Sequence, residues 1–283
     1  ELDSEKYAST SGSEEQMTVK PKKVALRRTS AAFGSASCKR VLFIRHGHAS
    51  HNRSLDFNNE KELDARLTSK GHEQIRQARE KYGSLLNSTE LLVMSPLSRA
   101  LQTGSLLFNL PDNSVPCVAL EVCREELSTH QCDRRRGLEE IRKDFDHVDF
   151  SVVSEFWPDE SVANESSEHA DTVWNTHFDR KAYDKRLKKK VFGTLRKGRV
   201  VVWKTWVEPT EELEARGDAL LNWIWNRPET DIAVVSHANF LYALFNRQAR
   251  DLRSSTAPEY ADARAMSKSW SNCEVRCMYV GEI

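Results

Sequence analysis

The sequence has no excess of charge of either sign, no long apolar run and no cysteine pair spaced for a metal site. Lysine plus arginine and aspartate plus glutamate both number 42, so attraction to nucleic acid or an acidic membrane surface is not indicated. No apolar stretch approaches the length of a membrane span. The 6 cysteines contain no Cys-x-x-Cys pair, which favours reduced thiols in a cytoplasmic compartment over a disulfide framework or a zinc site.

The length of 283 residues, 39% of them apolar, allows one large α/β domain or two smaller ones. Residues 1–16 are acidic and serine-rich, and residues 17–40 carry basic but no acidic side chains. We therefore expect residues 1–38 to form a disordered arm. If translation began at Met17, the basic stretch could be an organelle transit peptide, and this remains the alternative to a cytoplasmic location.

Short apolar runs alternate with stretches of helical periodicity along the chain. This alternation predicts an α/β three-layer sandwich with a mostly parallel central sheet and helices on both faces. The alternation breaks at about 130–209, which we interpret as an inserted cap of one domain spanning 39–283. The expected strands are 41–44, 91–94, 115–120, 231–235 and 273–280. The expected helices have their apolar faces within 75–86, 97–108, 138–145, 213–224 and 241–245.

Polar side chains follow several of these strands. Arg45 and His46 follow the first, Arg99 lies in the helix after the second, Glu125 comes after the third, and His237 follows a later one. Because the carboxyl ends of parallel strands meet at one edge of a sheet, we expect these side chains to converge. Guanidinium groups can neutralise phosphoryl oxygens, a neutral imidazole can attack in line, and a protonated carboxyl can protonate the leaving oxygen. The pattern therefore favours phosphoryl transfer.

Four segments resemble the histidine phosphatase superfamily, the phosphoglycerate-mutase-like family. The segments are 41–52, 67–71, 95–103 and 235–237. The resemblance implies that His46 is the catalytic nucleophile and becomes phosphohistidine. It also implies that Arg45, Arg99 and the catalytic His237 hold the phosphoryl group, with Asn52 assisting in substrate binding.

The same resemblance implies a proton donor that later acts as the base for water. Glu125 is expected in this role, and its neighbour Glu126 is the alternative. The family's usual residues after Arg-His-Gly are replaced here by His48 and Ala49, and the tyrosine and lysine typical of a mutase are missing from 127–136. We therefore expect metal-independent hydrolysis of phosphoric monoesters without a cofactor. The substrate would be a phosphorylated small molecule or a phosphoprotein, and mutase-type phosphotransfer is the alternative.

Two further hypotheses belong to other classes of protein. A metal hydrolase could use His46, His48 and His51 with His130 or His237, but no aspartate lies close among these histidines. A catalytically silent binding member of the fold is the second, and the presence of every required residue type argues against it. The arginines at 134–136 could bind a second anionic group of the substrate or form a solvated surface patch.

Overall fold

The computed structural model describes residues 23–34, 37–52, 60–128, 130–153, 208–253 and 265–283. Within these ranges lies a six-stranded sheet with the order β1-β6-β2-β5-β3-β4. Neighbouring strands among β2, β5, β3 and β4 pair in parallel, while β6 pairs antiparallel with both β2 and β1. The sheet is therefore mostly parallel, as predicted. Its strands are β1 (Val24–Arg27), β2 (Cys38–Arg45), β3 (Leu91–Met94), β4 (Cys117–Ala119), β5 (Asp231–Ser236) and β6 (Val275–Glu282).

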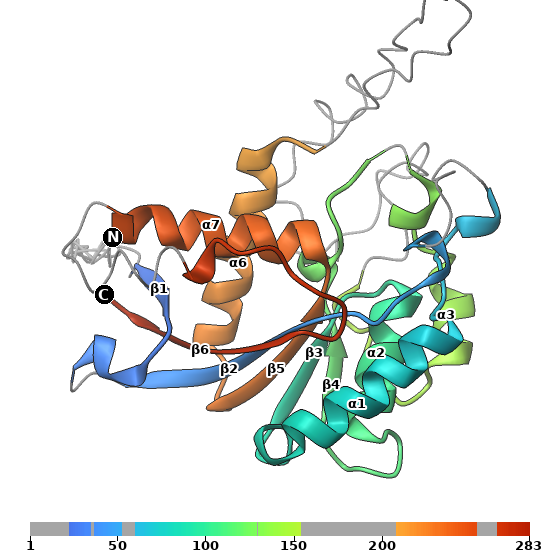
Figure 1. Cartoon of the computed structure of the whole chain (residues 1–283), viewed down its shortest axis with the longest axis horizontal. Coiled ribbons are helices and arrows are strands. Elements are labelled where there is room, and N and C mark those ends of the chain that lie inside the picture. Colours follow the sequence, from blue (N-terminus) through green and yellow to red (C-terminus); the bar gives the residue numbers. More distant parts are fainter. Residues whose placement is uncertain (1–22, 35–36, 53–59, 129, 154–207, 254–264) are drawn as a thin grey trace, which may run out of the picture.

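Helices cover the two faces of the sheet (Figure 1). Alternate residues of β2 show the two layers, because Val41 and Phe43 pack in one apolar cluster and Leu42 and Ile44 in another. The first cluster includes residues of α6 and α7, and the second includes residues of α1, α2 and α3. This three-layer arrangement confirms the predicted fold class. The helices are α1 (Ser69–Leu86), α2 (Ser98–Phe108), α3 (Leu138–Asp144), α6 (Thr210–Trp225) and α7 (Ala238–Arg253).

The start of α1 is fixed against the loop that follows β2. Thr68 is the N-cap, and its side-chain oxygen accepts the Gly71 N–H at 3.3 Å, which satisfies one free donor of the first turn. A Cβ atom on Gly71 would lie 2.3 Å from the carbonyl oxygen of His48. Only glycine allows this close approach, so the first turn of α1 supports the loop after β2 directly.

Strand β1 and the short 3-10 helix η1 (Ser30–Phe33) lie within the arm that was predicted to be disordered. That prediction is wrong for residues 24–33. Leu26 is fully buried and pairs with Val280 of β6, at the other end of the chain, so the strand is stabilised by a contact that no local pattern reveals. Residues 1–22, and the part of the expected cap at 154–207, lie outside the described residues.

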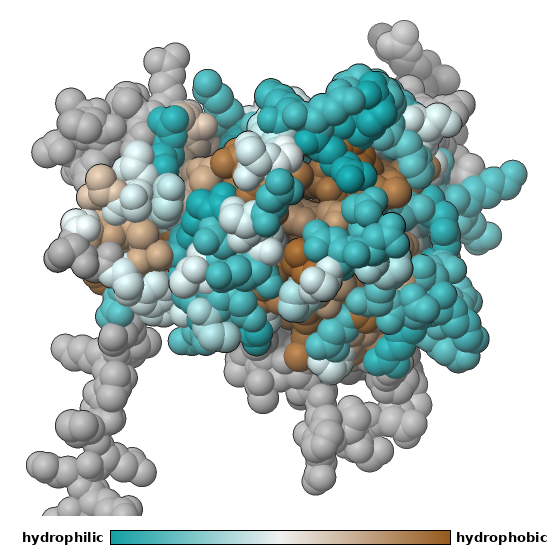
Figure 2. Space-filling view, turned by 90° about the horizontal axis from the view of Figure 1, so that it is seen from below, coloured by the Kyte–Doolittle hydropathy of each residue, from teal (hydrophilic) through white to brown (hydrophobic). Residues whose placement is uncertain are grey.

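Few large apolar side chains are exposed on the described part of the chain. Figure 2 shows hydrophilic residues over much of one face, with apolar residues visible between them. Isolated exposed apolar residues are normal for a globular protein and do not indicate a docking surface. Among the described residues, no helix combines the length and apolar character needed to cross a membrane. The large exposed apolar residues are Leu63, Leu85, Leu106, Tyr242 and Ile283.

Candidate active site

Two histidines meet at the carboxyl edge of the sheet because their strands are neighbours. β2 and β5 pair in register, with Arg45 opposite Ser236, so His46 and His237 follow side by side. Their ring centroids lie 5.0 Å apart, and both side chains are buried. The charges of Arg45 and Arg99 act on both rings and lower the pKa of each imidazole, after the larger effect of burial. The structure thus brings these four predicted residues together, and we call them the histidine cluster.

The hydrogen bonding of His46 defines its tautomer. Nδ1 lies 2.7 Å from the carbonyl oxygen of Gly47, and a carbonyl oxygen only accepts, so Nδ1 carries the proton. Nε2 is therefore left with its lone pair. Burial, then Arg99, His51 and Arg45, hold the pKa of His46 well below its usual range. The ring is a neutral imidazole, which is the form that can act as a nucleophile.

The arginines of the cluster use only part of their donors within the protein. Arg45 donates from Nη1 to the carbonyl oxygen of Trp270 at 2.7 Å, and Arg99 donates from Nη1 to the carbonyl oxygen of Cys132. The Nε atoms of both arginines and Nδ1 of His237 are buried without a hydrogen-bond partner among the described residues. Leaving such groups unpaired costs about 1–3 kcal/mol each. Their convergence in one place is typical of a site that receives a polar ligand.

Glu125 is held at the start of α7. Its Oε1 accepts the N–H groups of Glu126 at 2.9 Å and of Asn239 and Phe240 at 3.2 Å, the last two from the first turn of the helix. Burial and the charge of Asp133 nevertheless raise the pKa of Glu125 to about 7, against the opposing effects of Arg99 and the backbone N–H groups. A carboxyl with this pKa is protonated in part at neutral pH and can both donate and accept a proton.

Glu126 lies in a different environment. Its Oε2 accepts a hydrogen bond from Nδ2 of Asn239 at 3.1 Å. Burial and the charges of Glu208 and Asp133 raise the pKa of Glu126. The charge of Glu125, by contrast, acts on Arg45 of the histidine cluster. Of the two carboxylates, Glu125 is therefore the one whose charge acts on the arginines of the cluster, which suits a proton donor for this site.

Asn52, which was expected to bind substrate, is exposed, and its side chain contacts His51. Its Nδ2 lies 3.1 Å from Nε2 of His51, whose ring centroid is 5.8 Å from that of His46. The sequence pattern suggested His51 only as a metal ligand. Its position directly before Asn52 was the available signal, and the structure places both residues in the short 3-10 helix η2 (Ser50–Asn52).

Other histidines and arginines singled out from the sequence contact neighbouring parts of the protein. His48 points to the start of α1, where Nδ1 lies 2.9 Å from Oγ1 of Thr68. Arg135 is buried 3.5 Å from a carboxylate oxygen of Glu121, and Arg136 forms ion pairs with two aspartates of neighbouring segments. Within the described ranges, no three His, Cys, Asp or Glu side chains are grouped so that they could hold a metal ion. The six cysteines are all free thiols, as predicted.

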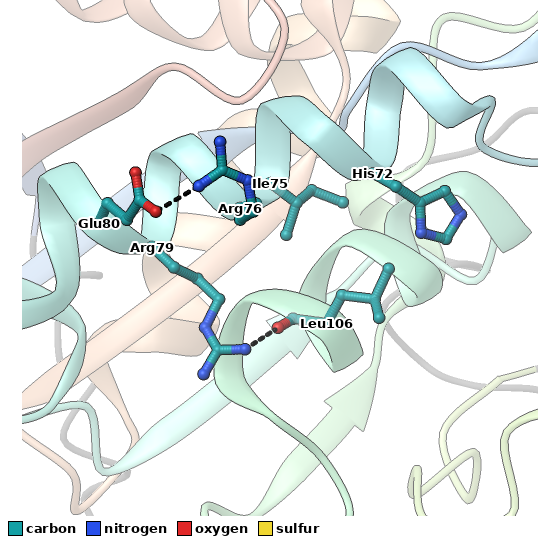
Figure 3. A pocket seen from close by; sticks show the side chains of 6 residues that line it. All are labelled: His72, Ile75, Arg76, Arg79, Glu80 and Leu106. Carbon is teal, nitrogen blue, oxygen red and sulfur yellow. Dashed lines mark hydrogen bonds and ion pairs between the residues drawn. The ribbon is translucent and has the colours of Figure 1, made fainter.

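A separate pocket of about 470 Å³ lies between α1 and α2 (Figure 3). None of the residues of the histidine cluster lines it. The Arg76 side chain pairs with Glu80 on the same helix, and Arg79 donates to the carbonyl oxygen of Leu106 at 3.4 Å. Because these cations are engaged inside the pocket wall, the pocket offers no cluster of unmet donors comparable to that around His46. Its lining is completed by His72 and Ile75.

Comparisons with known proteins agree with this geometry. The family model of the histidine phosphatase superfamily (branch 1) matches residues 41–145. A phosphoglycerate mutase-like protein of Arabidopsis thaliana is 28% identical over 277 residues, covering 86% of this chain and 84% of its own. Phosphoglycerate mutase-like protein 1 of the same plant is 28% identical over 276 residues, covering 86% and 81%.

Solved structures with a similar chain path include two mycobacterial proteins. Mycobacterial hydrolase 1 has a TM-score of 0.44 at 16% identity, covering 86% of this chain and 92% of its own. Mycobacterial glucosyl-3-phosphoglycerate phosphatase, in complex with VO3, has a TM-score of 0.43 at 17% identity, covering 84% and 90%. The sheet order and the two strand-end histidines define an α/β three-layer sandwich with a candidate active site at the carboxyl edge of its parallel strands. The family model and the Arabidopsis relatives support the histidine phosphatase superfamily.

Proposed function

We propose that the chain is a metal-independent phosphatase that hydrolyses phosphoric monoesters through a phosphohistidine on His46. One observation carries the proposal. A neutral imidazole with its Nε2 lone pair available lies among buried arginine and histidine nitrogens that have no hydrogen-bond partner within the described residues. This arrangement supplies a nucleophile and a positive site for phosphoryl oxygens, the two needs of phosphoryl transfer.

In the first step, Nε2 of His46 attacks phosphorus while the ester P–O bond breaks. Arg45, Arg99 and His237 hold the three non-bridging oxygens and stabilise their charge. Glu125 in its protonated form gives its proton to the leaving oxygen, which departs as an alcohol. The products of the step are phosphohistidine and an ionised Glu125.

In the second step, the Glu125 carboxylate takes a proton from water as the water oxygen attacks phosphorus. The P–N bond breaks, inorganic phosphate leaves, and His46 returns to its neutral form. Glu125 thus regains a proton from water, in place of the one that left with the alcohol. The pKa of about 7 supports this exchange of roles, because both forms of the carboxyl are accessible at neutral pH.

Phosphotransfer of the mutase type is the second candidate, and the mutase-like names of the Arabidopsis relatives support it. A mutase must bind an acceptor hydroxyl of the substrate where a phosphatase places the attacking water. It must also bind the anionic group that accompanies this hydroxyl. Two arginines that could have served such a site, Arg135 and Arg136, are engaged with Glu121 and with Asp64 and Asp144. We therefore favour hydrolysis.

The test uses an aryl phosphate, with and without exhaustive chelation. Replacing His46 with Ala should reduce turnover on the order of 10⁴–10⁶-fold, as expected for the loss of a nucleophile. His48→Ala, in the same loop, is the matched control and should keep most of the activity. The native enzyme should yield a trapped phosphoryl group that is stable to alkali and labile to acid.

Near-normal turnover in His46→Ala would contradict the mechanism. Loss of activity on chelation, restored by a divalent ion, would favour a metal hydrolase. A native protein without turnover would be a silent binding member of the fold. A panel of phosphorylated metabolites and phosphopeptides, each with and without a second acceptor alcohol, would separate phosphatase from mutase and identify the substrate class.

A further inference from the structure

The loop after β2 places a second imidazole beside the nucleophile. The ring centroids of His51 and His46 are 5.8 Å apart, with the ring planes tilted by 54°. His51 lies in the short 3-10 helix η2, two residues after Ala49, whose backbone is bonded into the loop. The proposed reaction gives this ring no task. Its two nitrogens nevertheless differ in their surroundings, because Nε2 contacts Asn52 and Nδ1 is buried without a hydrogen-bond partner among the described residues.

The side-chain amide of Asn52 has a fixed orientation. The N–H of Ala49 donates to Oδ1 of Asn52 at 3.0 Å, and a backbone N–H can only donate. The amide oxygen is therefore turned toward the backbone, and the amide nitrogen is turned toward His51. This assignment follows from the backbone partner alone and does not depend on the protonation of the ring.

The amide in turn fixes the tautomer of His51. Nδ2 of Asn52 lies 3.1 Å from Nε2 of the ring, and an amide nitrogen only donates, so Nε2 must accept. In a neutral imidazole the proton is then on Nδ1. This Nδ1 atom is buried and has no hydrogen-bond partner among the described residues. It joins the Nε atoms of Arg45 and Arg99 and Nδ1 of His237, which share that property.

The ring is neutral in its surroundings. Burial, followed by the charge of Arg99, lowers the pKa of His51 to about 3, while Asp133 opposes the shift. At neutral pH the ring therefore presents one N–H donor and no positive charge. Such a donor can bind a phosphoryl oxygen without the desolvation cost of a further buried cation.

We propose that His51 is a further catalytic residue, donating from Nδ1–H to a non-bridging phosphoryl oxygen, and that Asn52 is the positioning residue that fixes its tautomer. The proposal rests on the proposed phosphatase function. It also assigns Asn52 a different role from direct substrate binding, because its amide contacts the far side of the ring. In the transition state three equatorial oxygens share the charge, and each can accept more than one hydrogen bond.

The experiment compares His51→Ala, Asn52→Asp and the double variant, assayed at pH 8 with an aryl phosphate. A carboxylate at 52 only accepts, so it would draw the ring proton to Nε2 and leave Nδ1 as an acceptor facing phosphoryl oxygens. Each single variant should lower kcat/KM on the order of 10²–10³-fold, the usual effect of losing one preorganised donor. Inhibition by orthovanadate, which adopts a five-coordinate form, should weaken by a similar factor.

The double variant distinguishes an effect of Asn52 through the His51 ring from a direct contact of Asn52 with the substrate. In the His51→Ala background, Asn52→Asp should change kcat/KM by no more than about twofold, because the ring through which it acts is absent. An equal loss in both backgrounds would show that Asn52 acts on the substrate itself and would overturn the proposal. A folded His51→Ala protein with native kcat/KM and native vanadate inhibition would overturn it as well.

A control variant and a spectroscopic measurement test whether the effect belongs to the His51 ring. His48→Ala removes an imidazole from the same loop and should keep native kcat/KM, and thermal melting shows whether each variant is folded. Nitrogen-15 NMR of the histidine rings should show His51 with its proton on Nδ1 in the native protein and on Nε2 in Asn52→Asp. A native ring protonated on Nε2 would overturn the proposal. Phosphohistidine formation on His46 tests the phosphatase function separately, since it does not require His51.

Discussion

Two clusters of buried positive charge at the carboxyl edge of the sheet differ in how their donors are used. In the histidine cluster, the Nε atoms of Arg45 and Arg99 lack a partner among the described residues. In the neighbouring cluster, Arg216 of α6 donates to the backbone carbonyl oxygens of residues 122, 124 and 125 at 2.9, 3.0 and 3.2 Å. It also donates to both oxygens of Glu208 at 2.8 and 2.7 Å. We call Arg216, Glu208 and the backbone of segment 122–127, which they bind, the clamp cluster.

The difference separates a surface prepared for a ligand from a scaffold. Unmet buried donors in the histidine cluster lower the stability of the free protein, and a phosphoryl group can satisfy them. The donors of Arg216 are satisfied internally, and they shape the segment that carries Glu125. Glu208 adds to this by accepting the Leu127 N–H at 3.0 Å and donating its own N–H to the Leu127 carbonyl oxygen at 2.7 Å. Loss of a side chain should therefore lower the reaction rate in the histidine cluster and the free energy of unfolding in the clamp cluster.

The largest expected contrast is between Arg45→Met and Arg216→Met. Arg45→Met should lower kcat/KM on the order of 10²–10³-fold. The change in melting temperature should be small, because the side chain gives up one internal hydrogen bond, to the Trp270 carbonyl oxygen, and its other donors are expected to serve the substrate. Arg216→Met should lower the free energy of unfolding by about 3–5 kcal/mol, because it leaves the carboxylate of Glu208 buried and unpaired. Urea unfolding and steady-state kinetics on both variants measure the contrast.

A matched double variant sharpens the second half of this prediction. Replacing Glu208 with Gln in the Arg216→Met background removes the uncompensated charge and should recover part of the lost stability. Equal stability of the native protein and Arg216→Met would show that the clamp cluster is not a scaffold. A large fall in the stability of Arg45→Met would show that the histidine cluster also contributes to folding.

Strand β1 offers a region remote from both clusters. Leu26→Ala should lower the free energy of unfolding by about 2–5 kcal/mol, since the side chain is fully buried against β6 and α6. The kcat/KM should stay near the native value, because the strand contributes no group to the edge that carries His46. The difference in the free energy of unfolding between a chain without residues 1–22 and one without residues 1–34 measures the stability that β1 and η1 contribute. A rate loss in folded Leu26→Ala would contradict this separation.

The residues predicted from sequence and those missed differ in the range of their contacts. Arg45, His46, Arg99 and His237 each lie just beyond a buried strand, so a local pattern and the parallel-sheet rule suffice to bring them together. Strand β1 and the clamp of Glu208 on Leu127 depend on partners far along the chain, which no periodicity encodes. Their identity follows only from the tertiary structure.

The roles proposed for His51 and Asn52 show a second limit of sequence reasoning. Both residues lie inside the recognised 41–52 segment, so their proximity to His46 was within reach. The direction of their hydrogen bonds was not, because it depends on the backbone N–H of Ala49 and on which face of the ring is buried. Position could be predicted here, whereas chemical role required geometry.

A pH series tests whether Glu125, whose segment the clamp cluster holds in place, donates the proton to the leaving oxygen. A general acid works only while protonated, so hydrolysis of an alkyl phosphate should fall as pH rises through the pKa of Glu125, about 7. The ratio of alkyl to aryl hydrolysis cancels the ionisation of the phosphate and should fall about tenfold per pH unit above that value. Glu125→Gln should lower the ratio at all pH values and leave it independent of pH.

Glu126→Gln is the control for this series. Its carboxylate contacts Asn239 and lies near Glu208, so the native pH dependence of the ratio should be retained. If Glu126→Gln abolishes the dependence and Glu125→Gln keeps it, the proton donor is Glu126. If neither variant changes it, the acid lies in another segment and the role given to this pair is wrong.

The smallest expected effect concerns acid stability and applies to the histidine cluster alone. Burial and the charge of Arg99 hold the pKa of His237 well below the unfolded value of about 6.5. The unfolded chain therefore binds a proton that the folded chain does not, and this contribution is complete above pH 6.5 and lost as pH falls below it. Between pH 7.5 and 5.5 the loss is about 1.4 kcal/mol for one histidine.

His237→Gln cannot take up this proton, so its free energy of unfolding should fall by about 1.4 kcal/mol less than that of the native protein over the same range. The difference between the two proteins matters because Glu125 acts in the opposite direction. Burial raises the pKa of that carboxyl to about 7, so its contribution is lost as pH rises. Because Glu125 is present in both proteins, subtraction removes its effect. Parallel stability curves would show that His237 takes up a proton as readily in the folded state as in the unfolded chain. The arginines of the histidine cluster would then not keep His237 neutral, and the contrast with the clamp cluster would lose its electrostatic basis.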